Sequence, residues 1–277
     1  SAGTRSAVTI NGIADIEADG AKAHTALDAA SSDIRIAGGT LRATGGALLV
    51  RASGTAANAG RIDINTVTDC AGMNKTVLAG NVSTGNGANA NGVINIGLNT
   101  SDSSWKGDYA ENNAGTLNLW MGSDAQWTGK TGASSNLNLS FLSSGGRWNV
   151  TGTSHVKNLT ASTNVGRSVF DMTKTANTDK LNIDNFSGKG YFLYGNTVST
   201  THDANTDTDV KHVTVNGAEV HVAKAANGSA ITLHTDAKTN TTGGWNWTTS
   251  GTPAEKNLTS SVVKALANKL YFEDAAA

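Results

Sequence analysis

Short triplets of the form apolar, polar, apolar recur along the whole 277-residue chain. Each is bounded by Gly, Asn, Asp, Ser or Thr. Alternation with a period of two residues is typical of a β-strand with one buried face, so the triplets predict a long series of short strands. They are Val8-Thr9-Ile10, Ile34-Arg35-Ile36, Ile62-Asp63-Ile64, Ile94-Asn95-Ile96, Leu117-Asn118-Leu119, Leu137-Asn138-Leu139, Leu181-Asn182-Ile183, Val213-Thr214-Val215, Val220-His221-Val222 and Ile231-Thr232-Leu233.

The spacing between strands indicates how they are arranged. Two series of landmarks share a period of 20–22 residues: Leu117, Leu137, Leu159 and Leu181, and Trp105, Trp127 and Trp148. Such a period without a helical interval is typical of a solenoid, in which each coil buries its apolar face against the next coil. We predict a parallel β-helix of about a dozen coils. The three tryptophans are expected to stack in its interior or along one corner.

Composition agrees with this fold. Hydrophobic residues make up 38% of the chain and there is a single proline. A narrow interior needs few apolar residues, and a strand in a ladder needs its N–H donors, which proline lacks. A β-sandwich also has short strands, but it is not expected to hold one period across two landmarks, so it stays the less favoured all-β alternative. The net charge of −1 excludes a protein that binds nucleic acid through its phosphates.

The end of the chain departs from the strand pattern. The apolar residues between Ser260 and Phe272 lie on one face of a predicted short helix, which follows Pro253. This helix is expected to cover the open edge of the last coil or to lead to a further domain. We therefore divide the chain into a β-helical segment, 1–252, and a loop, short helix and tail, 253–277.

Residues 105–194 contain longer motifs that are familiar in combination. They are Trp105-Lys106-Gly107, Trp127-Thr128-Gly129, Gly146-Arg147-Trp148-Asn149-Val150-Thr151-Gly152-Thr153-Ser154, Val156-Lys157-Asn158-Leu159, and Leu181-Asn182-Ile183-Asp184-Asn185-Phe186-Ser187-Gly188-Lys189-Gly190-Tyr191-Phe192. This stretch resembles the C-terminal part of autotransporter passenger domains of the pertactin and self-associating adhesin type. The resemblance implies a right-handed parallel β-helix on the outer surface of a Gram-negative bacterium, exported through a translocator barrel that lies outside this chain.

The sequence also differs from that family. An irregular polar run, 199–209, follows the motifs where the family continues into a further coil and a barrel. The first ten residues lack the basic start and apolar run of a signal peptide. We therefore expect an internal segment of a large surface protein.

A search for catalytic motifs finds one short match. Asn205-Thr206-Asp207 resembles a motif of polygalacturonase-like β-helical hydrolases, but their paired aspartates, Gly-His-Gly and Arg-Ile-Lys do not occur in the sequence. We expect no enzyme, no catalytic residues and no cofactor. A β-helical polysaccharide hydrolase or lyase remains the alternative.

Other polar clusters offer candidate contacts. Asp203, Asn205, Asp207 and Asp209 place oxygen side chains two residues apart, as in a calcium loop, but the Gly and Glu of a complete loop are missing, so a solvated loop is favoured. A zinc site at His212, His221 and His234 is disfavoured because no characteristic ligand spacing supports it.

Cysteine and tryptophan complete the candidates. Cys70 has no basic neighbour that would lower its pKa, so it is expected to be a buried structural thiol. Exposed tryptophans can bind sugar rings, and Trp245 and Trp247, on a predicted loop beside Gly243-Gly244, are the best candidates for exposed contact.

The function predicted from these features is adhesion. Stacked outward Asn, Thr and Asp side chains would form polar ladders that pair with a second copy of the chain or with a host glycan or protein. Many weak contacts along a rod would then give avidity. The alternation also predicts that Leu139→Asp unfolds the protein, whereas Asn138→Asp is tolerated.

Overall fold

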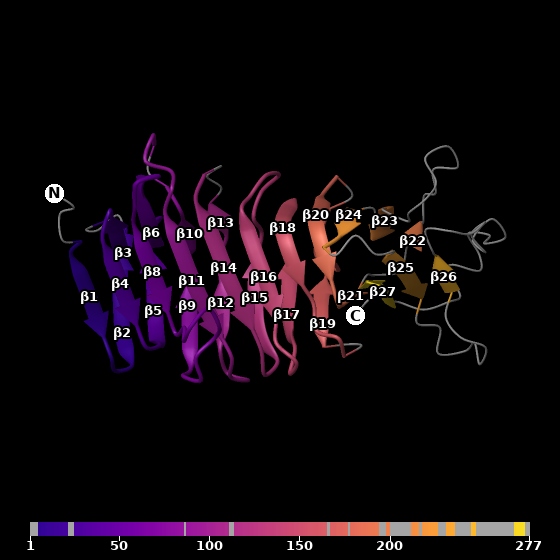
Figure 1. The fold of residues 1–277 in the computed structure, drawn as a ribbon, viewed down its shortest axis with the longest axis horizontal. Helices are drawn as coiled ribbons and strands as arrows, with labels where there is room; N and C mark the ends of the chain where they lie inside the picture. Colours follow the sequence, from indigo (N-terminus) through magenta and orange to yellow (C-terminus); the bar gives the residue numbers. More distant parts are fainter. Residues whose placement is uncertain are drawn as a thin grey trace.

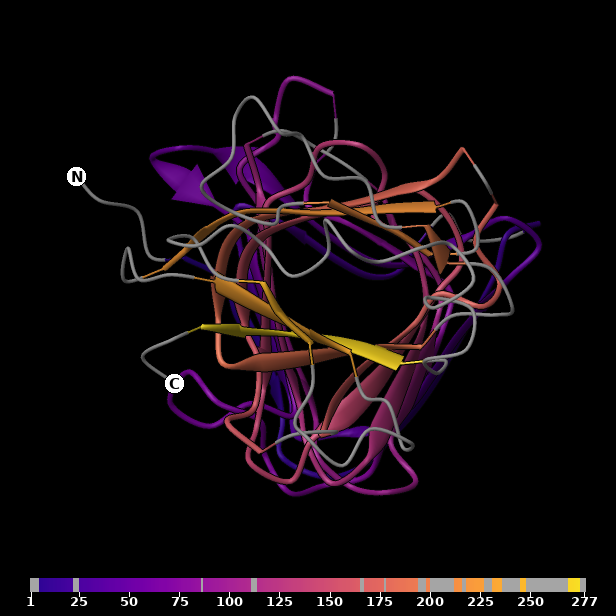
Figure 2. The same ribbon diagram turned by 90° about the vertical axis from the view of Figure 1, so that its right-hand side faces the viewer.

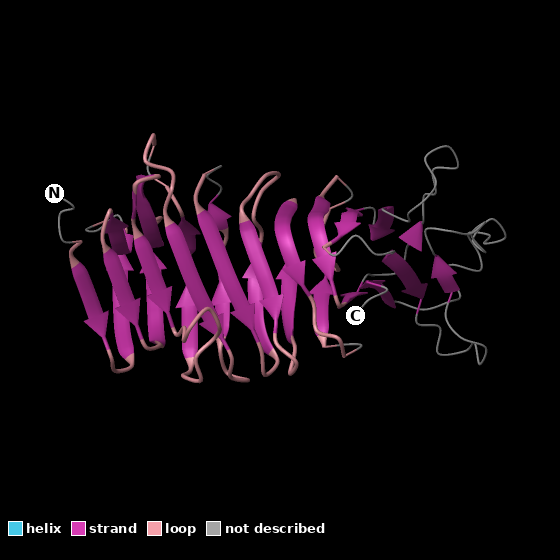
Figure 3. Ribbon diagram, viewed as in Figure 1, coloured by secondary structure: helices cyan, strands magenta, loops and turns pink. Residues whose placement is uncertain are grey.

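The protein is an all-β parallel solenoid of about seven turns. The computed structural model describes residues 5–21, 25–85, 87–110, 114–164, 167–176, 178–193, 198–199, 212–215, 218–226, 231–235, 245–247 and 269–274. Every regular element within these ranges is a strand (Figure 3). Successive coils lie side by side along a rod, with β1 (Ala7–Ile10) at one end (Figure 1). The predicted β-helix is thereby confirmed.

Three sheets run along the rod. Sheet A has the order β1, β4 (Asp33–Ile36), β8 (Arg61–Ile64), β11 (Val93–Leu98), β14 (Thr116–Met121), β16 (Leu137–Phe141), β18 (Ser154–Thr160), β20 (Lys180–Ser187), β24 (Ala218–Ala225), β23 (His212–Val215) and β22 (Val198–Ser199). Sheet B has the order β2 (Ala14–Asp19), β5 (Gly39–Thr44), β9 (Thr76–Ala79), β12 (Ser104–Lys106), β15 (Ala125–Gly129), β17 (Gly146–Val150), β19 (Ser168–Asp171), β21 (Lys189–Leu193), β27 (Lys269–Asp274), β25 (Ile231–Thr235) and β26 (Trp245–Trp247).

Sheet C is shorter and lies only in the N-terminal part of the rod. Its order is β13 (Tyr109–Ala110), β10 (Asn81–Ser83), β6 (Leu48–Thr55) and β3 (Thr25–Ala30), and β7 (Asn58–Ala59) pairs with β6. All pairings are parallel from β1 to β24 in sheet A and from β2 to β21 in sheet B, and those beyond are antiparallel.

Coil length changes where sheet C ends. In the N-terminal coils, which have three strands each, Asp33 pairs with Arg61 and Arg61 with Val93, spacings of 28 and 32 residues. In the later two-strand coils, Leu117 pairs with Leu137 and Trp105 with Trp127, spacings of 20 and 22. The expected dozen coils was therefore wrong, because the 20–22 period holds only for the two-strand coils.

The register confirms one predicted series and corrects the other. Trp105, Trp127 and Trp148 are direct partners on sheet B. On sheet A, however, Leu159 pairs with Leu139 and Phe186 and not with Leu137 and Leu181. In β18 the neighbours Lys157 and Asn158 are both exposed, so the alternation is interrupted and the constant spacing misplaces the rung.

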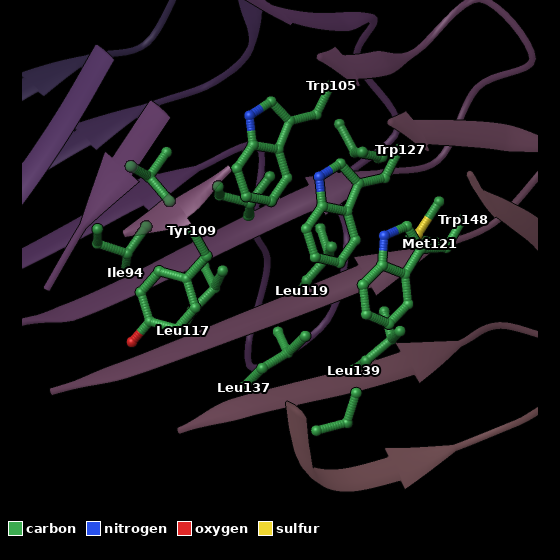
Figure 4. Packing of buried hydrophobic residues seen from close by; sticks show 14 of the residues in the cluster. Ile94, Trp105, Tyr109, Leu117, Leu119, Met121, Trp127, Leu137, Leu139 and Trp148 are labelled. Atoms are coloured by element: carbon green, nitrogen blue, oxygen red, sulfur yellow. The ribbon is translucent and has the colours of Figure 1, made fainter. Parts of the chain in front are cut away.

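The predicted tryptophan stack forms part of the core. Trp105 and Trp127 lie with ring centroids 4.7 Å apart, and Trp127 and Trp148 with centroids 4.3 Å apart, nearly parallel in both cases (Figure 4). Phe170 and Phe192 continue the column in the next coils. Leucines of sheet A, such as Leu119 and Leu139, face the stack and are fully buried. Viewed along the rod, the coils surround one common interior (Figure 2), which these side chains fill.

Glycine two residues after tryptophan lets neighbouring coils approach closely. Each indole Nε1–H donates to a backbone carbonyl of the preceding coil: Trp105 to Gly80 at 2.9 Å and Trp127 to Gly107 at 3.0 Å. A Cβ on Gly129 would overlap the Gly107 carbonyl oxygen and lie 2.9 Å from Trp127 Nε1. The repeated Trp-x-Gly motif thus satisfies a buried indole donor at a site where only glycine fits.

The predicted C-terminal helix is wrong where the structure describes it. Lys269–Phe272, its last turn, belong to β27, which pairs antiparallel with β21 and β25. Leu270, Tyr271 and Phe272 favour extended backbone, and β21 offers an unpaired edge that a strand satisfies directly and a helix does not. Residues 253–268 lie outside the described ranges.

Candidate binding surface on the outer face of sheet A

A continuous ladder of hydrogen-bonded side chains runs along the outer face of sheet A. The polar residue at the centre of each strand donates its Nδ2–H to the side-chain oxygen of the preceding coil. The donor–acceptor pairs are Asn95 to Asp63 at 2.6 Å, Asn118 to Asn95 at 2.7 Å, Asn138 to Asn118 at 2.8 Å, Asn158 to Asn138 at 2.7 Å, and Asn185 to Asn158 at 2.9 Å. We call this set the amide ladder.

The amide ladder follows directly from the strand pattern. In Leu137-Asn138-Leu139 both leucines are buried, so Asn138 between them faces outward. Parallel in-register pairing then places Asn138 between Asn118 and Asn158, one strand spacing away on either side. The predicted outward polar ladder is confirmed for these asparagines.

Asp63 ends the ladder and is an ionised carboxylate held by several donors. Arg61 Nε lies 3.0 Å from both carboxylate oxygens, and Arg35 Nη2 lies 3.4 Å from Oδ2. Burial alone would raise the pKa of the Asp63 carboxyl, but the hydrogen bonds from Arg61, Asn95 and Arg35 outweigh it, so the pKa is lowered. A permanently charged group therefore lies at the start of a row of neutral amides.

A hairpin crosses the outer face of sheet A beside Asp63. Val67 and Cys70 exchange two backbone hydrogen bonds, of 2.9 and 3.1 Å, around Thr68 and Asp69, whose φ angles are 43° and 56°. Positive φ at both central residues defines a tight hairpin turn of type I′. Thr66 and Ala71 form a bridge at its base. We call residues 66–71 the crossing hairpin.

Asn65 and Gly97 fix the crossing hairpin on the sheet. Asn65 is buried and donates its Nδ2–H groups toward the carbonyl oxygens of Asn74 and Gly97, at 2.8 and 3.0 Å. A Cβ on Gly97 would overlap the Asn65 carbonyl oxygen and lie 2.7 Å from Ala71 Cα. The absence of a side chain at Gly97 is what lets the hairpin lie against β11.

A pocket of about 360 Å³ lies between the crossing hairpin and the sheet. It combines charged side chains of both signs with one aromatic ring. Its lining residues are Arg35, Arg61, Asp63, Thr66, Val67, Thr68, Asp69, Asn95 and Trp120. We call it the ladder pocket, because Asp63 and Asn95 belong to both features.

Trp120 is the residue of this site that sequence reasoning misses. Leu117, Leu119 and Met121 are fully buried, so Trp120 lies on the outer face with Asn118 and is only partly buried. Its register partners are Gly97 and Ser140, whose small size leaves room for the indole. Outward parity within β14 was the available signal.

The predicted contact residues mostly fall outside the described ranges. Asp203, Asn205, Asp207 and Asp209 all do, so the calcium loop stays untested, as does the Asn205-Thr206-Asp207 tripeptide. Trp245 and Trp247 were expected on a loop, but their backbone forms β26, paired antiparallel with β25, where cross-strand pairing with Leu233 and Thr235 favours extended backbone. Their side chains are not described.

The remaining titratable candidates are placed as follows. His212 and His221 are register partners in β23 and β24, whereas His234 lies in sheet B. Cys70 is partly exposed and not buried as predicted, because it lies at the turn of the crossing hairpin. Among the described residues, no group of three or more His, Cys, Asp or Glu side chains gathers as a metal site.

Two further findings concern membranes and relatives. Within the described ranges no helix has the length and apolar character needed to cross a membrane. No protein-family model, curated protein or solved structure matches this chain. What the site does must therefore be argued from its own geometry.

The lowered pKa of Asp63 predicts an acid-dependent contribution to stability. A carboxyl whose pKa is lower in the folded state stabilises the fold above its unfolded pKa, and this is lost as the pH falls through the folded pKa. We expect Asp63→Asn to lower the free energy of unfolding by about 1–3 kcal/mol at pH 7, and by progressively less below about pH 4. Urea unfolding of both proteins between pH 7 and pH 3 measures this, and a constant difference across the range would contradict it.

Proposed function

We propose that this chain is a β-helical adhesion segment of a bacterial cell surface, of the autotransporter-passenger type, that makes contact through the outer face of sheet A. The observation that carries the proposal is the amide ladder from Asp63 to Asn185. A side-chain amide has two N–H donors and two acceptor positions. Within the ladder, Asn118 and Asn138 each donate one hydrogen bond and accept one. Each therefore retains a donor and an acceptor for a partner.

The ladder suits a partner that also repeats. Donors and acceptors recur about every 4.8 Å, which is the strand spacing of a parallel sheet. A second copy of the chain would present the same spacing, and a host glycan or an extended protein segment would present its own row of polar groups. Each contact is weak in water, but many along one rod act together.

The resemblance in residues 105–194 adds the cellular setting to this proposal. Its motifs include Trp105-Lys106-Gly107 and Trp127-Thr128-Gly129, which in this structure build the buried core. A surface location and export through a separate translocator barrel are accordingly part of the proposal, and no cofactor is needed. Asp63, which the arginines keep ionised, serves charge pairing in this role and is poorly suited to donating a proton.

Beads coated with the full chain test the adhesive role. We expect such beads to aggregate with one another or to bind to host-cell monolayers. In the double variant Asn118→Thr and Asn138→Thr, which keeps strand-favouring residues at both rungs, aggregation or binding should fall by about tenfold or more, because avidity multiplies the loss at each rung.

A matched variant on the opposite sheet controls for a general surface effect. Lys106→Thr and Gln126→Thr replace two exposed residues of sheet B in the neighbouring coils. Beads carrying this variant should behave as wild type, and circular dichroism should show both variants folded. Equal losses in the two variants, or wild-type beads that neither aggregate nor bind cells, would refute the proposal.

A further inference from the structure

The ladder pocket holds guanidinium groups that the protein does not use fully. Arg61 contacts Asp63 through Nε alone, and Arg35 through Nη2 alone. Within the described residues, the Nη atoms of Arg61 and the Nε and Nη1 atoms of Arg35 have no protein acceptor. Their side chains are 44% and 66% exposed. Two fixed, planar sets of donors therefore face the pocket.

An acceptor and an aromatic ring lie among these donors. The Asp69 carboxylate, at the turn of the crossing hairpin, receives no hydrogen bond from the described residues, although its charge acts on Arg61. The partly buried Trp120 lines the same pocket. The pocket thus offers unpaired donors, an unpaired acceptor and an apolar indole surface together.

The geometry points to a site for one residue of a neutral saccharide in the ladder pocket. A pyranose ring has apolar C–H groups on its faces, which suit an indole, and hydroxyls at its edge that both donate and accept. Planar guanidinium and carboxylate groups bind neighbouring hydroxyls in pairs. The volume of about 360 Å³ lies at the lower end of the roughly 300–1,000 Å³ of ligand pockets, as one sugar residue requires.

Charge balance favours a neutral saccharide over an acidic one. The pocket has two arginines, Arg35 and Arg61, and two aspartates, Asp63 and Asp69. The cationic charge is therefore compensated within the site before any ligand arrives. A carboxylated or sulfated sugar would meet Asp69 without a surplus positive charge to offset the repulsion.

A second pocket next to the first indicates more than one sugar residue. It has a volume of about 180 Å³ and shares Arg35, Thr66 and Val67 with the ladder pocket. It also includes Met73, which is 73% exposed. An oligosaccharide lying across the crossing hairpin would occupy both. The inference rests on the proposed adhesive function, since it names a glycan as the class of partner.

An oligosaccharide array followed by calorimetric titration tests this site. The full chain is applied to neutral, carboxylated and sulfated oligosaccharides, and the strongest binder is titrated. Trp120→Ala should weaken binding by about tenfold or more, and Trp120→Phe should restore most of it. Asp69→Asn, at an exposed turn where Asn tolerates positive φ, should weaken binding without affecting folding. Ser140→Ala, the next outward rung from Trp120, should bind as wild type.

The outcomes separate this site from the adhesive role of the ladder. Binding confined to neutral oligosaccharides and lost in Trp120→Ala and Asp69→Asn supports it. No binding to any oligosaccharide, preference for acidic ones, or full binding by both variants overturns it. The bead assay with Asn118→Thr and Asn138→Thr is read independently, so aggregation that persists when saccharide binding fails would leave the adhesive function standing and remove only the pocket.

Discussion

Replacing Trp127 by alanine is expected to lower the free energy of unfolding by about 3–5 kcal/mol, the usual range for truncating a large buried aromatic residue. Trp127 is fully buried between Trp105 and Trp148. The truncation would leave a cavity between two indoles and remove the donor that Trp127 Nε1 provides to Gly107. A domain is stable by only about 5–15 kcal/mol, so the loss would be a large part of the total. Urea unfolding followed by far-ultraviolet circular dichroism measures it.

Trp120→Ala is the matched control for this loss. Both tryptophans lie in the same coil, in β14 and β15, but Trp120 is outward and partly buried. Its truncation leaves no closed cavity, so the expected cost is about 1 kcal/mol. Equal costs for the two variants would show that the inward stack does not contribute more to the core than a surface indole does.

The tryptophan stack also shows why so much of the fold was predictable. Trp105, Trp127 and Trp148 stack because the two-strand coils that carry them have nearly equal length, so sequence spacing translates directly into register. The same logic failed at Leu159, where consecutive exposed residues in β18 shift the alternation. It also failed for the number of coils, because sheet C lengthens the N-terminal turns and leaves no fixed period there.

The outer face was predictable only in part. The amide ladder follows from alternation plus register, and both can be read from a triplet such as Leu117-Asn118-Leu119. The ladder pocket cannot be read in this way, since it gathers Arg35, Asp69 and Trp120 from separate coils. Their meeting depends on where the crossing hairpin folds back, which a single side-chain deletion, Gly97, makes possible.

Leu139→Asp is expected to abolish folding. Leu139 is fully buried on the inner face of β16, and its register partners Leu119 and Leu159 are buried with it. A carboxylate there would have no cation or donor to pair with, and burying an unpaired charge costs more than a domain of ordinary stability can tolerate. Circular dichroism should show loss of the β-sheet signal, and cooperative urea unfolding should disappear.

Asn138→Asp, one residue away, tests the opposite face, and the structure changes the tolerance expected from alternation alone. Asn138 donates to Asn118 at 2.8 Å, and an aspartate would instead place a carboxylate oxygen against the Asn118 carbonyl oxygen. Asn158 would still donate to it from the next coil, at a position where water also reaches the side chain. We therefore expect a folded protein that is about 1–2 kcal/mol less stable than wild type. An unchanged urea midpoint would show that the amide ladder contributes nothing to stability, and complete unfolding would contradict the assignment of Asn138 to the outer face.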